Sequence, residues 1–335
     1  MNNNSLWPLI VVILLALGLG FVNGFNDTAN AIATVIGTRA LSPKTALIIA
    51  TVLNGVGCLT GVAVARTIGK GILVPEAVTY EVCIAGLISI VLWGLVATLW
   101  GLPISLTHGF ISGLAGAGWA IFGFGAVVWP VLLPIIVWVF GAPFLAFIAG
   151  FVVMVGLYWM FRRNTPHTVS SIFSHLQVIS ASFMAYSHGL NDGQNPMAVM
   201  LMGMVIYTGS TSVWDNVPWW PMWLSALSMS IGTAAGGWQV IQTLGMKVTT
   251  LRPWHGFAAE LGAAGVIEVA SLLGVPISTT HAISASIFGV GATLPFQAVR
   301  WGVGRDIVTA WVVTFPLCGG LAFIIAFILK LIFLH

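Results

Sequence analysis

An unusual polar motif occurs twice in this chain, each time inside strongly apolar sequence. Residues 24–30 read GFNDTAN, and residues 189–195 read GLNDGQN. A second motif is also duplicated, as PISLTH at 103–108 and PISTTH at 276–281. The copies lie 165 residues apart for the first motif and 173 for the second, which indicates a divergent tandem duplication and excludes a short-period solenoid. The chain is therefore predicted to fold as two related halves.

The apolar surroundings of these motifs define the class of protein. Hydrophobic residues make up 59% of the chain and charged residues only 6%, values that exclude a water-soluble domain. The apolar stretches are continuous, whereas the strands of a transmembrane barrel would alternate apolar and polar residues. We predict an all-α polytopic membrane protein, located in the cell (plasma or inner) membrane. The small net charge of +3 gives no indication of a nucleic-acid partner.

Several stretches reach the roughly 20 apolar residues that a spanning helix needs. The stretch 129–161 is long enough for two passes, and shorter glycine-rich pieces beside the motifs predict half-helices. We expect about ten to twelve membrane segments, roughly half in each repeat. The predicted spans lie near 6–22, 45–65, 82–101, 129–161, 196–209, 219–241, 257–274 and 307–333, and the half-helices at 28–38, 109–126 and 282–294.

A polar and basic stretch at 162–182 interrupts the apolar sequence midway along the chain. It predicts a first transporter-like repeat at 1–161, a linker at 162–182 and a second repeat at 183–335. The adjacent Arg162 and Arg163 indicate a cytoplasmic linker, because short cytoplasmic segments are enriched in basic residues. An odd number of crossings in each half would invert the second copy relative to the first, as in many secondary transporters.

The GFNDTAN and GLNDGQN motifs predict broken helices that bind cations. Glycine, asparagine and aspartate compete with helical hydrogen bonding, so each apolar helix is expected to break at its motif. Pro196 stands where a new helix would begin in the second copy. Freed backbone groups are tolerated within a membrane beside a bound ion, and each motif supplies a carboxylate. A cation is therefore predicted at the carboxylate of each motif, Asp27 in the first copy and Asp192 in the second.

The PISLTH and PISTTH motifs predict helix N-termini that bind an oxyanion. Proline followed by serine and threonine before a glycine-rich apolar stretch is typical of a helix start. Free amides and about half a positive charge at such an end favour an anion, and the hydroxyls add neutral donors. These donors are Ser105, Thr107, Ser278, Thr279 and Thr280.

Charge balance connects the two kinds of motif. The two aspartates and an oxyanion are all negative, and none of the four motifs contains lysine or arginine. Uncompensated charges in a low dielectric cost several kcal/mol each. Cations are therefore expected to enter with the anion, which favours symport over an anion channel with basic rings.

With GFNDTANA, SHGLNDGQN and the two PIS(L/T)TH motifs in a duplicated apolar chain, the sequence resembles the inorganic phosphate transporter (PiT) family over nearly its whole length. The resemblance implies a phosphate importer rather than an enzyme, with sodium or protons as co-substrate and no other cofactor. It also implies a homodimer of chains with two inverted repeats, both termini outside and the linker inside. The implied phosphate ligands are Ser105, Thr107, Gln194, Ser278, Thr279 and Thr280, and the implied sodium ligands are Asn26, Asp27, Asn191 and Asp192.

Other polar residues near the motifs have two open interpretations each. The histidines of the PIS motifs either contact the ligand or bond the backbone. Glu260 is either a further cation or proton site or a buried acid paired to a neighbour, and His188 is either proton-sensitive or an ordinary donor. The possible further contacts are Asn23, Asn30, His108, Asn195, Glu260 and His281.

Two alternative functions remain open from the sequence. A sulfate permease of the same family is the first, because sulfate and phosphate are both tetrahedral and the motifs contain both donors and acceptors. An intramembrane metal-dependent hydrolase is the second, although the chain has no H-E-x-x-H or comparable metal motif.

Overall fold

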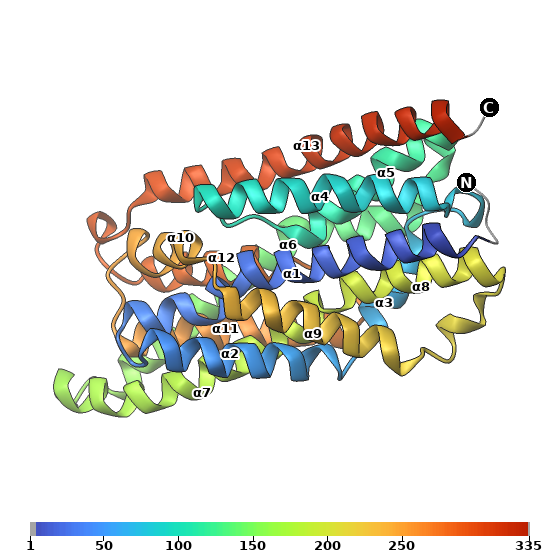
Figure 1. Ribbon diagram of the computed structural model, residues 1–335. Coiled ribbons are helices and arrows are strands. Elements are labelled where there is room, and N and C mark those ends of the chain that lie inside the picture. The colour runs from blue at the N-terminus through green and yellow to red at the C-terminus, as the bar shows by residue number, and fades with distance from the viewer. Residues whose placement is uncertain (1–4, 334–335) are drawn as a thin grey trace.

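A computed structural model describes residues 5–333 of the chain. Within this range the chain forms helices and connecting segments, with two isolated antiparallel bridges but no β-strand. Most helices lie along one long axis, and the first residues of α1 and the last residues of α13 lie at the same end of the bundle (Figure 1). The prediction of an all-α protein is confirmed.

The first half contains six α-helices and the second half seven. In the first half the helices are α1 (Leu6–Gly37), α2 (Pro43–Cys58), α3 (Ala63–Gly71), α4 (Tyr80–Trp100), α5 (Leu106–Phe122) and α6 (Trp129–Met160), with short turns η1 (Pro75–Ala77) and η2 (Phe124–Ala126). In the second half they are α7 (Pro166–Asp192), α8 (Gln194–Thr208), α9 (Trp219–Ala235), α10 (Trp238–Gln242), α11 (Pro253–Leu272), α12 (Thr279–Gly291) and α13 (Trp301–Phe333), with η3 (Thr211–Trp214), η4 (Thr243–Lys247) and η5 (Phe296–Ala298).

Among the described helices, four are long and apolar enough to cross a membrane alone: α1, α4, α6 and α13. The pair α2 and α3 bends by 61° at a short break and would make a fifth span, where the sequence predicted one uninterrupted stretch. The two passes allowed for 129–161 are wrong, because α6 is one helix of 32 residues that continues through Pro134 and Pro143. The total of ten to twelve segments stays a prediction.

The expected linker is mostly helical. The Thr165 hydroxyl accepts a hydrogen bond from the Thr168 amide at 3.3 Å, and Pro166 occupies the first turn of α7. Both features favour a helix start, so residues 166–182 form the first turns of α7 rather than a loop. Only a short turn at 161–165 separates α6 from α7.

The two GxND motifs differ in backbone structure. The predicted break in the first copy is wrong, because α1 runs unbroken through residues 24–30, and 28–38 is not a separate half-helix. The break in the second copy is confirmed, since α7 ends at Asp192 and α8 begins at Gln194. Pro196 has no N–H to offer the Asp192 carbonyl, whereas its counterpart Ala31 keeps its N–H. In the break, the Asn23 amide donates to that carbonyl at 3.4 Å.

The PIS segments form tight helix-to-helix connections. Gly101 follows α4 and Gly274 follows α11, both at φ +71°, a left-handed conformation that favours glycine. A proline then prevents continuation, and Ser105 and Ser278 cap the next helices. The expected half-helices α5 and α12 are thus confirmed, beginning three residues earlier than predicted.

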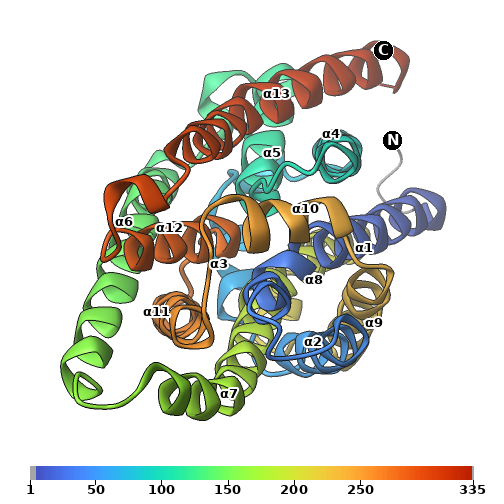
Figure 2. The same ribbon diagram turned by 90° about the vertical axis from the view of Figure 1, so that its left-hand side faces the viewer.

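Helices of the first half pack against helices of the second. Helix α1 packs on α9 and α2 on α7, while α5 packs on α13 and α12 on α6. Viewed along the bundle, α5 and α12 lie inside the long outer helices α13 and α6 (Figure 2). Glycines permit the closest approaches: a Cβ on Gly24 would lie 2.1 Å from the Met229 carbonyl oxygen, and one on Gly189 would lie 2.1 Å from that of Asn54. This packing brings all four motifs to the centre.

Candidate functional site

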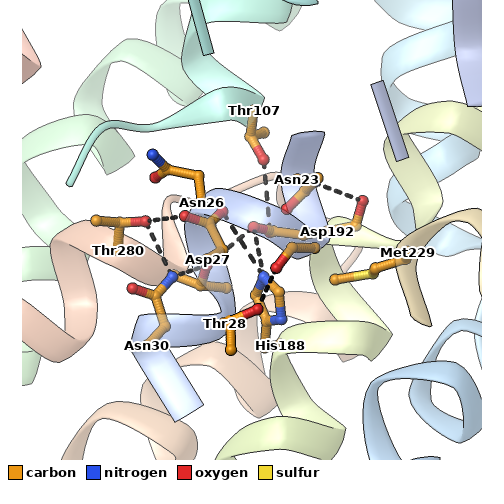
Figure 3. Close-up of polar contacts among 12 residues, drawn as sticks. Asn23, Asn26, Asp27, Thr28, Asn30, Thr107, His188, Asp192, Met229 and Thr280 are labelled. Atoms are coloured by element: carbon orange, nitrogen blue, oxygen red, sulfur yellow. Dashed lines mark hydrogen bonds and ion pairs between the residues drawn. The ribbon is translucent and has the colours of Figure 1, made fainter. Parts of the chain in front are cut away.

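Two aspartates from the duplicated motifs meet at the centre of the bundle, with a histidine between them (Figure 3). One ligand atom from each of Asp27, His188 and Asp192 lies within 4.8 Å of the others. The Nε2 atom of His188 is 3.4 Å from Asp192 Oδ2 and 3.7 Å from Asp27 Oδ2. All three side chains are at most 2% exposed. We call these three residues the acidic cluster.

Threonines from the PIS motifs donate to this acidic cluster. The Thr280 hydroxyl donates to Asp27 Oδ1 at 2.8 Å. The Thr279 hydroxyl donates to Asp192 Oδ2 at 2.9 Å, and that of Thr107 to Asp192 Oδ1 at 3.4 Å. The motifs predicted to bind a cation and those predicted to bind an anion therefore form one connected site.

Asparagine amides support the threonine hydroxyls in both halves. The Asn30 amide donates to the hydroxyl of Thr280 at 2.9 Å, and the Asn195 amide donates to that of Thr107 at 2.8 Å. These contacts are equivalent under the duplication. They leave each hydroxyl hydrogen free to point at a carboxylate or another acceptor.

Several buried oxygen atoms of the GxND motifs and of the adjacent Asn23 lack a donor among the described residues. An unpaired buried acceptor is costly, and carboxylate and amide oxygens are ligands that hard cations prefer. The arrangement therefore suits one or more small hard cations. The atoms are Oδ1 of Asn23, Asn26, Asn30 and Asn195, and Oδ2 of Asp27.

The imidazole of His188 is oriented by a residue that the sequence did not identify as a site residue. Its Nδ1 lies 3.0 Å from the Asn54 Oδ1 oxygen, and the Asn54 amide donates to Thr233 at 3.0 Å. An amide oxygen only accepts, so Nδ1 carries a hydrogen, and Nε2 faces two carboxylates. Among the described residues, no lysine or arginine forms an ion pair with either aspartate.

The remaining motif asparagines are held in equivalent ways in the two halves. The Asn26 amide donates to the Thr98 hydroxyl at 2.8 Å, and the Asn191 amide lies 2.8 Å from the hydroxyl of Ser271. The orientation that satisfies both ends of the Asn191 amide turns its nitrogen toward Asp192 Oδ1, to which it donates at 3.0 Å, while its oxygen accepts from the Ser271 hydroxyl at 2.8 Å. Thr98 and Ser271 were missed from the sequence, although they lie 173 residues apart like the PIS motifs.

The serines of the PIS motifs cap their own helices. Ser105 Oγ accepts from the His108 amide at 3.2 Å, and Ser278 Oγ accepts from the His281 amide at 3.1 Å. Each hydroxyl hydrogen remains available to a ligand at the helix end. The N-termini of α5 and α12 thus present donors beside the acidic cluster.

Gln194 is bonded away from the two carboxylates. Its Oε1 accepts from the Ala65 amide in the first turn of α3 at 2.9 Å, and its Nε2 donates to the Leu190 carbonyl at 2.6 Å. The structure does not bring it into the same hydrogen-bonded network as the PIS threonines.

Glu260 lies in a separate buried polar cluster. Its carboxylate accepts from Gln177 Nε2 at 3.1 Å and from the hydroxyls of Thr34 and Ser180. Of the two interpretations open from the sequence, the structure shows the acid bonded to neutral neighbours.

The PIS histidines contact each other rather than the acidic cluster. Their ring centroids are 5.1 Å apart, and His281 stacks on Trp311 at 3.9 Å. Neither ring nitrogen of His108 has a hydrogen-bond partner among the described residues, so its side chain is not bonded to the backbone.

Known proteins with similar sequences and a similar fold are transporters. The model of the Phosphate transporter family matches residues 23–322. A Bacillus subtilis protein named "Probable low-affinity inorganic phosphate transporter" is 37% identical over 97% of this chain and 98% of its own length. A Rhizobium meliloti protein of the same name is 39% identical, covering 94% and 95%.

A solved structure described as "The sodium-dependent phosphate transporter" matches with a TM-score of 0.90 and 27% identity, over 97% of this chain and 99% of the other. These relatives support neither a hydrolase nor a sulfate permease. This chain is a multi-pass plasma membrane protein and a transporter rather than an enzyme. It belongs to the phosphate transporter family.

Proposed function

We propose that this protein imports inorganic phosphate by symport with sodium, at the acidic cluster and the PIS helix ends. The family supports the substrate, and the sodium-dependent structural neighbour supports the cation. One observation carries the coupling: the PIS threonines, which are the predicted anion donors, donate to the aspartates, which are the predicted cation ligands. The two ligands therefore compete for, or share, the same hydrogen bonds.

This arrangement gives a physical basis for coupling. Without a cation, the hydroxyl hydrogen of Thr280 is held by Asp27, and that of Thr279 by Asp192. A sodium ion on the carboxylates takes up their lone pairs and repels the hydroxyl hydrogens, which then turn toward an incoming oxyanion. The positive ions also offset the charge of phosphate in a site that no lysine or arginine neutralises. Sodium is expected to bind first and to raise the affinity for phosphate.

The phosphate ligands in this proposal are the hydroxyls and amides at the N-termini of α5 and α12. The half-charge of each helix end favours a doubly charged anion, and hydroxyls donate to its oxygens. The acceptor oxygens of the asparagines suit the P–OH hydrogen, which sulfate lacks at neutral pH. The proposed ligands are Ser105, Thr107, Ser278, Thr279 and Thr280, with Gln194 as a more distant candidate.

We further propose that residues 1–161 and 183–335 are inverted repeats that move relative to each other. Helices α1 and α7, which carry the equivalent GxND motifs, run in opposite directions along the bundle (Figure 1). The equivalent contacts of Asn30 with Thr280 and of Asn195 with Thr107 support the same relation. A homodimer is proposed from the family resemblance.

The test is uptake into proteoliposomes with each gradient imposed separately. We expect labelled phosphate to accumulate under an inward sodium gradient and unlabelled sulfate to compete poorly. Uptake driven by a proton gradient alone, with no effect of sodium, would refute sodium coupling. Equal competition by sulfate would refute the assignment of the substrate.

Equilibrium binding tests the proposed order. Sodium should strengthen phosphate binding, and phosphate should strengthen sodium binding by the same factor, as linkage requires. Phosphate affinity that is independent of sodium would contradict the release of hydroxyls described above.

A further inference from the structure

A deep apolar groove of about 490 Å³ lies between α5, α6 and α13, on the outer side of α5 from the acidic cluster. Glycines shape the groove in two ways. At Gly116 the backbones of α5 and α13 touch, because a Cβ there would lie 2.1 Å from the Gly319 carbonyl oxygen. At Gly320 the groove is open, because a Cβ there would meet nothing within 4 Å. Proline at position 316 and phenylalanine at 315 and 323 complete the α13 side. The groove is large enough for one long alkyl chain.

The length of the groove matches one leaflet of a bilayer. Its walls extend along α5 from His108 to Trp119. The eleven residue steps between these two positions correspond to about 16 Å of helix. Half of a bilayer's hydrocarbon core is about 15 Å thick. An acyl chain that enters at Trp119 would therefore reach the inner end at His108.

The Trp119 end of the groove has the features of a membrane interface. The rings of Trp119, Phe124 and Trp129 stack on one another, with centroids 5.1 to 6.3 Å apart, and tryptophan is enriched at headgroup depth. The Trp119 Nε1 hydrogen is buried and has no acceptor among the described residues. An unpaired indole N–H points to a missing acceptor, such as an ester carbonyl.

A positive charge lies at the same end. The Lys330 ammonium donates to the Ile121 carbonyl at 3.0 Å, two residues beyond Trp119 on α5. No carboxylate in the described part of the chain pairs with it. Its other hydrogens are available to an anionic headgroup, which a basic residue near a membrane surface attracts.

We propose that this groove is a binding site for an anionic diacyl phospholipid. One acyl chain lies between α5, α6 and α13, the ester carbonyl accepts from Trp119 Nε1, and the phosphate of the headgroup pairs with Lys330. The site is separate from the transported anion and does not rest on the proposed function. Since α5 begins at the PIS motif, an occupied groove would fix the position of that helix end.

The equivalent groove in the other half shows why this one is chosen. It lies along α12 and the first part of α13 and is lined by Trp301 and Trp311, among others. Both indole hydrogens there already have acceptors, the carbonyls of Phe296 at 3.2 Å and Pro103 at 3.1 Å. The position equivalent to Trp119 is Ala292, which offers no donor. Only the first groove combines an unpaired donor with an unpaired cation.

Native mass spectrometry of the purified full chain tests the proposal, with phosphatidylglycerol and phosphatidylcholine as probes. The wild type should retain one phosphatidylglycerol after delipidation. Gly320→Leu fills the groove and should abolish retention, whereas Gly302→Leu, on the same helix and also with open space at its Cβ, should not. Lys330→Gln should weaken phosphatidylglycerol binding about fivefold and phosphatidylcholine binding less, because choline already neutralises the phosphate of that lipid.

Three results would overturn the proposal. The first is unchanged retention in Gly320→Leu that still folds, as judged by its thermal unfolding. The second is an equal loss in Gly302→Leu. The third is a wild-type dimer that Gly320→Leu converts to a monomer with no change in bound lipid, since the groove would then be covered by a second copy of the chain.

Discussion

The two halves of the protein share a framework but differ in the polar groups that they place on it. Asn26 with Thr98 and Asn191 with Ser271 make equivalent contacts of 2.8 Å. The hydrogen bonds that the two aspartates accept are not equivalent. Asp27 accepts from one PIS threonine, whereas Asp192 accepts from two, because PISTTH has Thr279 where PISLTH has Leu106.

The second half also supplies the ionisable groups that the first half lacks. His188 corresponds to Asn23 under the offset of 165, and Glu260 corresponds to Leu87 under the offset of 173. The paired helix ends and the two carboxylates are therefore common to both halves. The additional polar groups lie in one half and give the two carboxylates different surroundings. Variants at equivalent positions of the two halves can test that distinction.

The largest effects are expected from the two aspartates. Asp27→Asn and Asp192→Asn keep the shape of the side chain but remove the charge that holds a cation. Each should reduce sodium-driven phosphate uptake about 100-fold or more. Their stabilities should differ, because Asp192 accepts more hydrogen bonds than Asp27. Uptake in proteoliposomes and thermal unfolding of the purified variants measure the two effects.

Two outcomes would contradict these expectations for the aspartates. Full uptake by either variant would remove that carboxylate from the cation site. Equal thermal stability of the two variants would show that the additional hydroxyl donors at Asp192 contribute nothing measurable.

The PIS threonines should give the next largest effects. Thr280→Val removes a hydroxyl that donates to Asp27 at 2.8 Å, and Thr107→Val removes one at 3.4 Å from Asp192. Loss of a hydrogen bond to a charged group corresponds to about a tenfold or greater change, so Thr280→Val should raise the half-saturating phosphate concentration about tenfold. Thr107→Val removes a proposed phosphate donor from the other helix end and should raise this concentration as well.

Thr280→Ser is the matched control, because it keeps the hydroxyl and removes only a methyl group. Its uptake should resemble that of the wild type. A defect in Thr280→Ser as large as that in Thr280→Val would mean that packing, rather than donation, explains the effect.

The sequence was sufficient for the fold class and for the family, because composition and repeated motifs report burial and local backbone preference directly. The helix starts at Ser105 and Ser278 followed from the N-cap preference of serine after proline. No local sequence pattern placed Asp27 next to Asp192; their proximity was expected only because both were assigned to one central site. The structure confirms that they meet; their role as ligands stays a proposal.

Other features depended on contacts between distant segments. The polar residues of GFNDTAN predicted a break, but in α1 their side chains bond to other helices and leave the backbone helical, as when Asn30 donates to Thr280. The hydrogen-bond donors of Glu260 come from α1 and α7, and the sequence alone does not show that these helices lie beside it. The orientation of His188 by Asn54 was missed for the same reason.

Glu260→Leu makes the second half resemble the first and should affect stability more than transport. It leaves the Gln177 amide and the Thr34 hydroxyl without their acceptor, whereas the Ser180 hydroxyl keeps the Gln177 carbonyl at 3.1 Å. Stranded buried donors should lower the free energy of unfolding by about 3 kcal/mol. The midpoint of thermal unfolding measures this, with Leu87→Ile as a control for an apolar change at the equivalent site. An unaltered midpoint would show that the cluster does not stabilise the fold.

The smallest effect is expected from Leu106→Thr, which gives the first half the sequence PISTTH. Leu106 is 1% exposed. A Cβ added to Gly94 would lie 2.7 Å from the Cδ2 atom of Leu106, so the leucine side chain fills the space beside this glycine. The smaller threonine should lower the free energy of unfolding by about 1 to 2 kcal/mol. Leu106→Val has nearly the same shape, so the difference between the two variants isolates the hydroxyl. If Leu106→Thr is the more stable of the two and binds sodium differently, its hydroxyl reaches Asp27 as Thr279 reaches Asp192, and the asymmetry of the site lies in one side chain. If it is the less stable, the backbone around Asp27 does not accept a second donor, and the asymmetry extends to the position of the helix end itself.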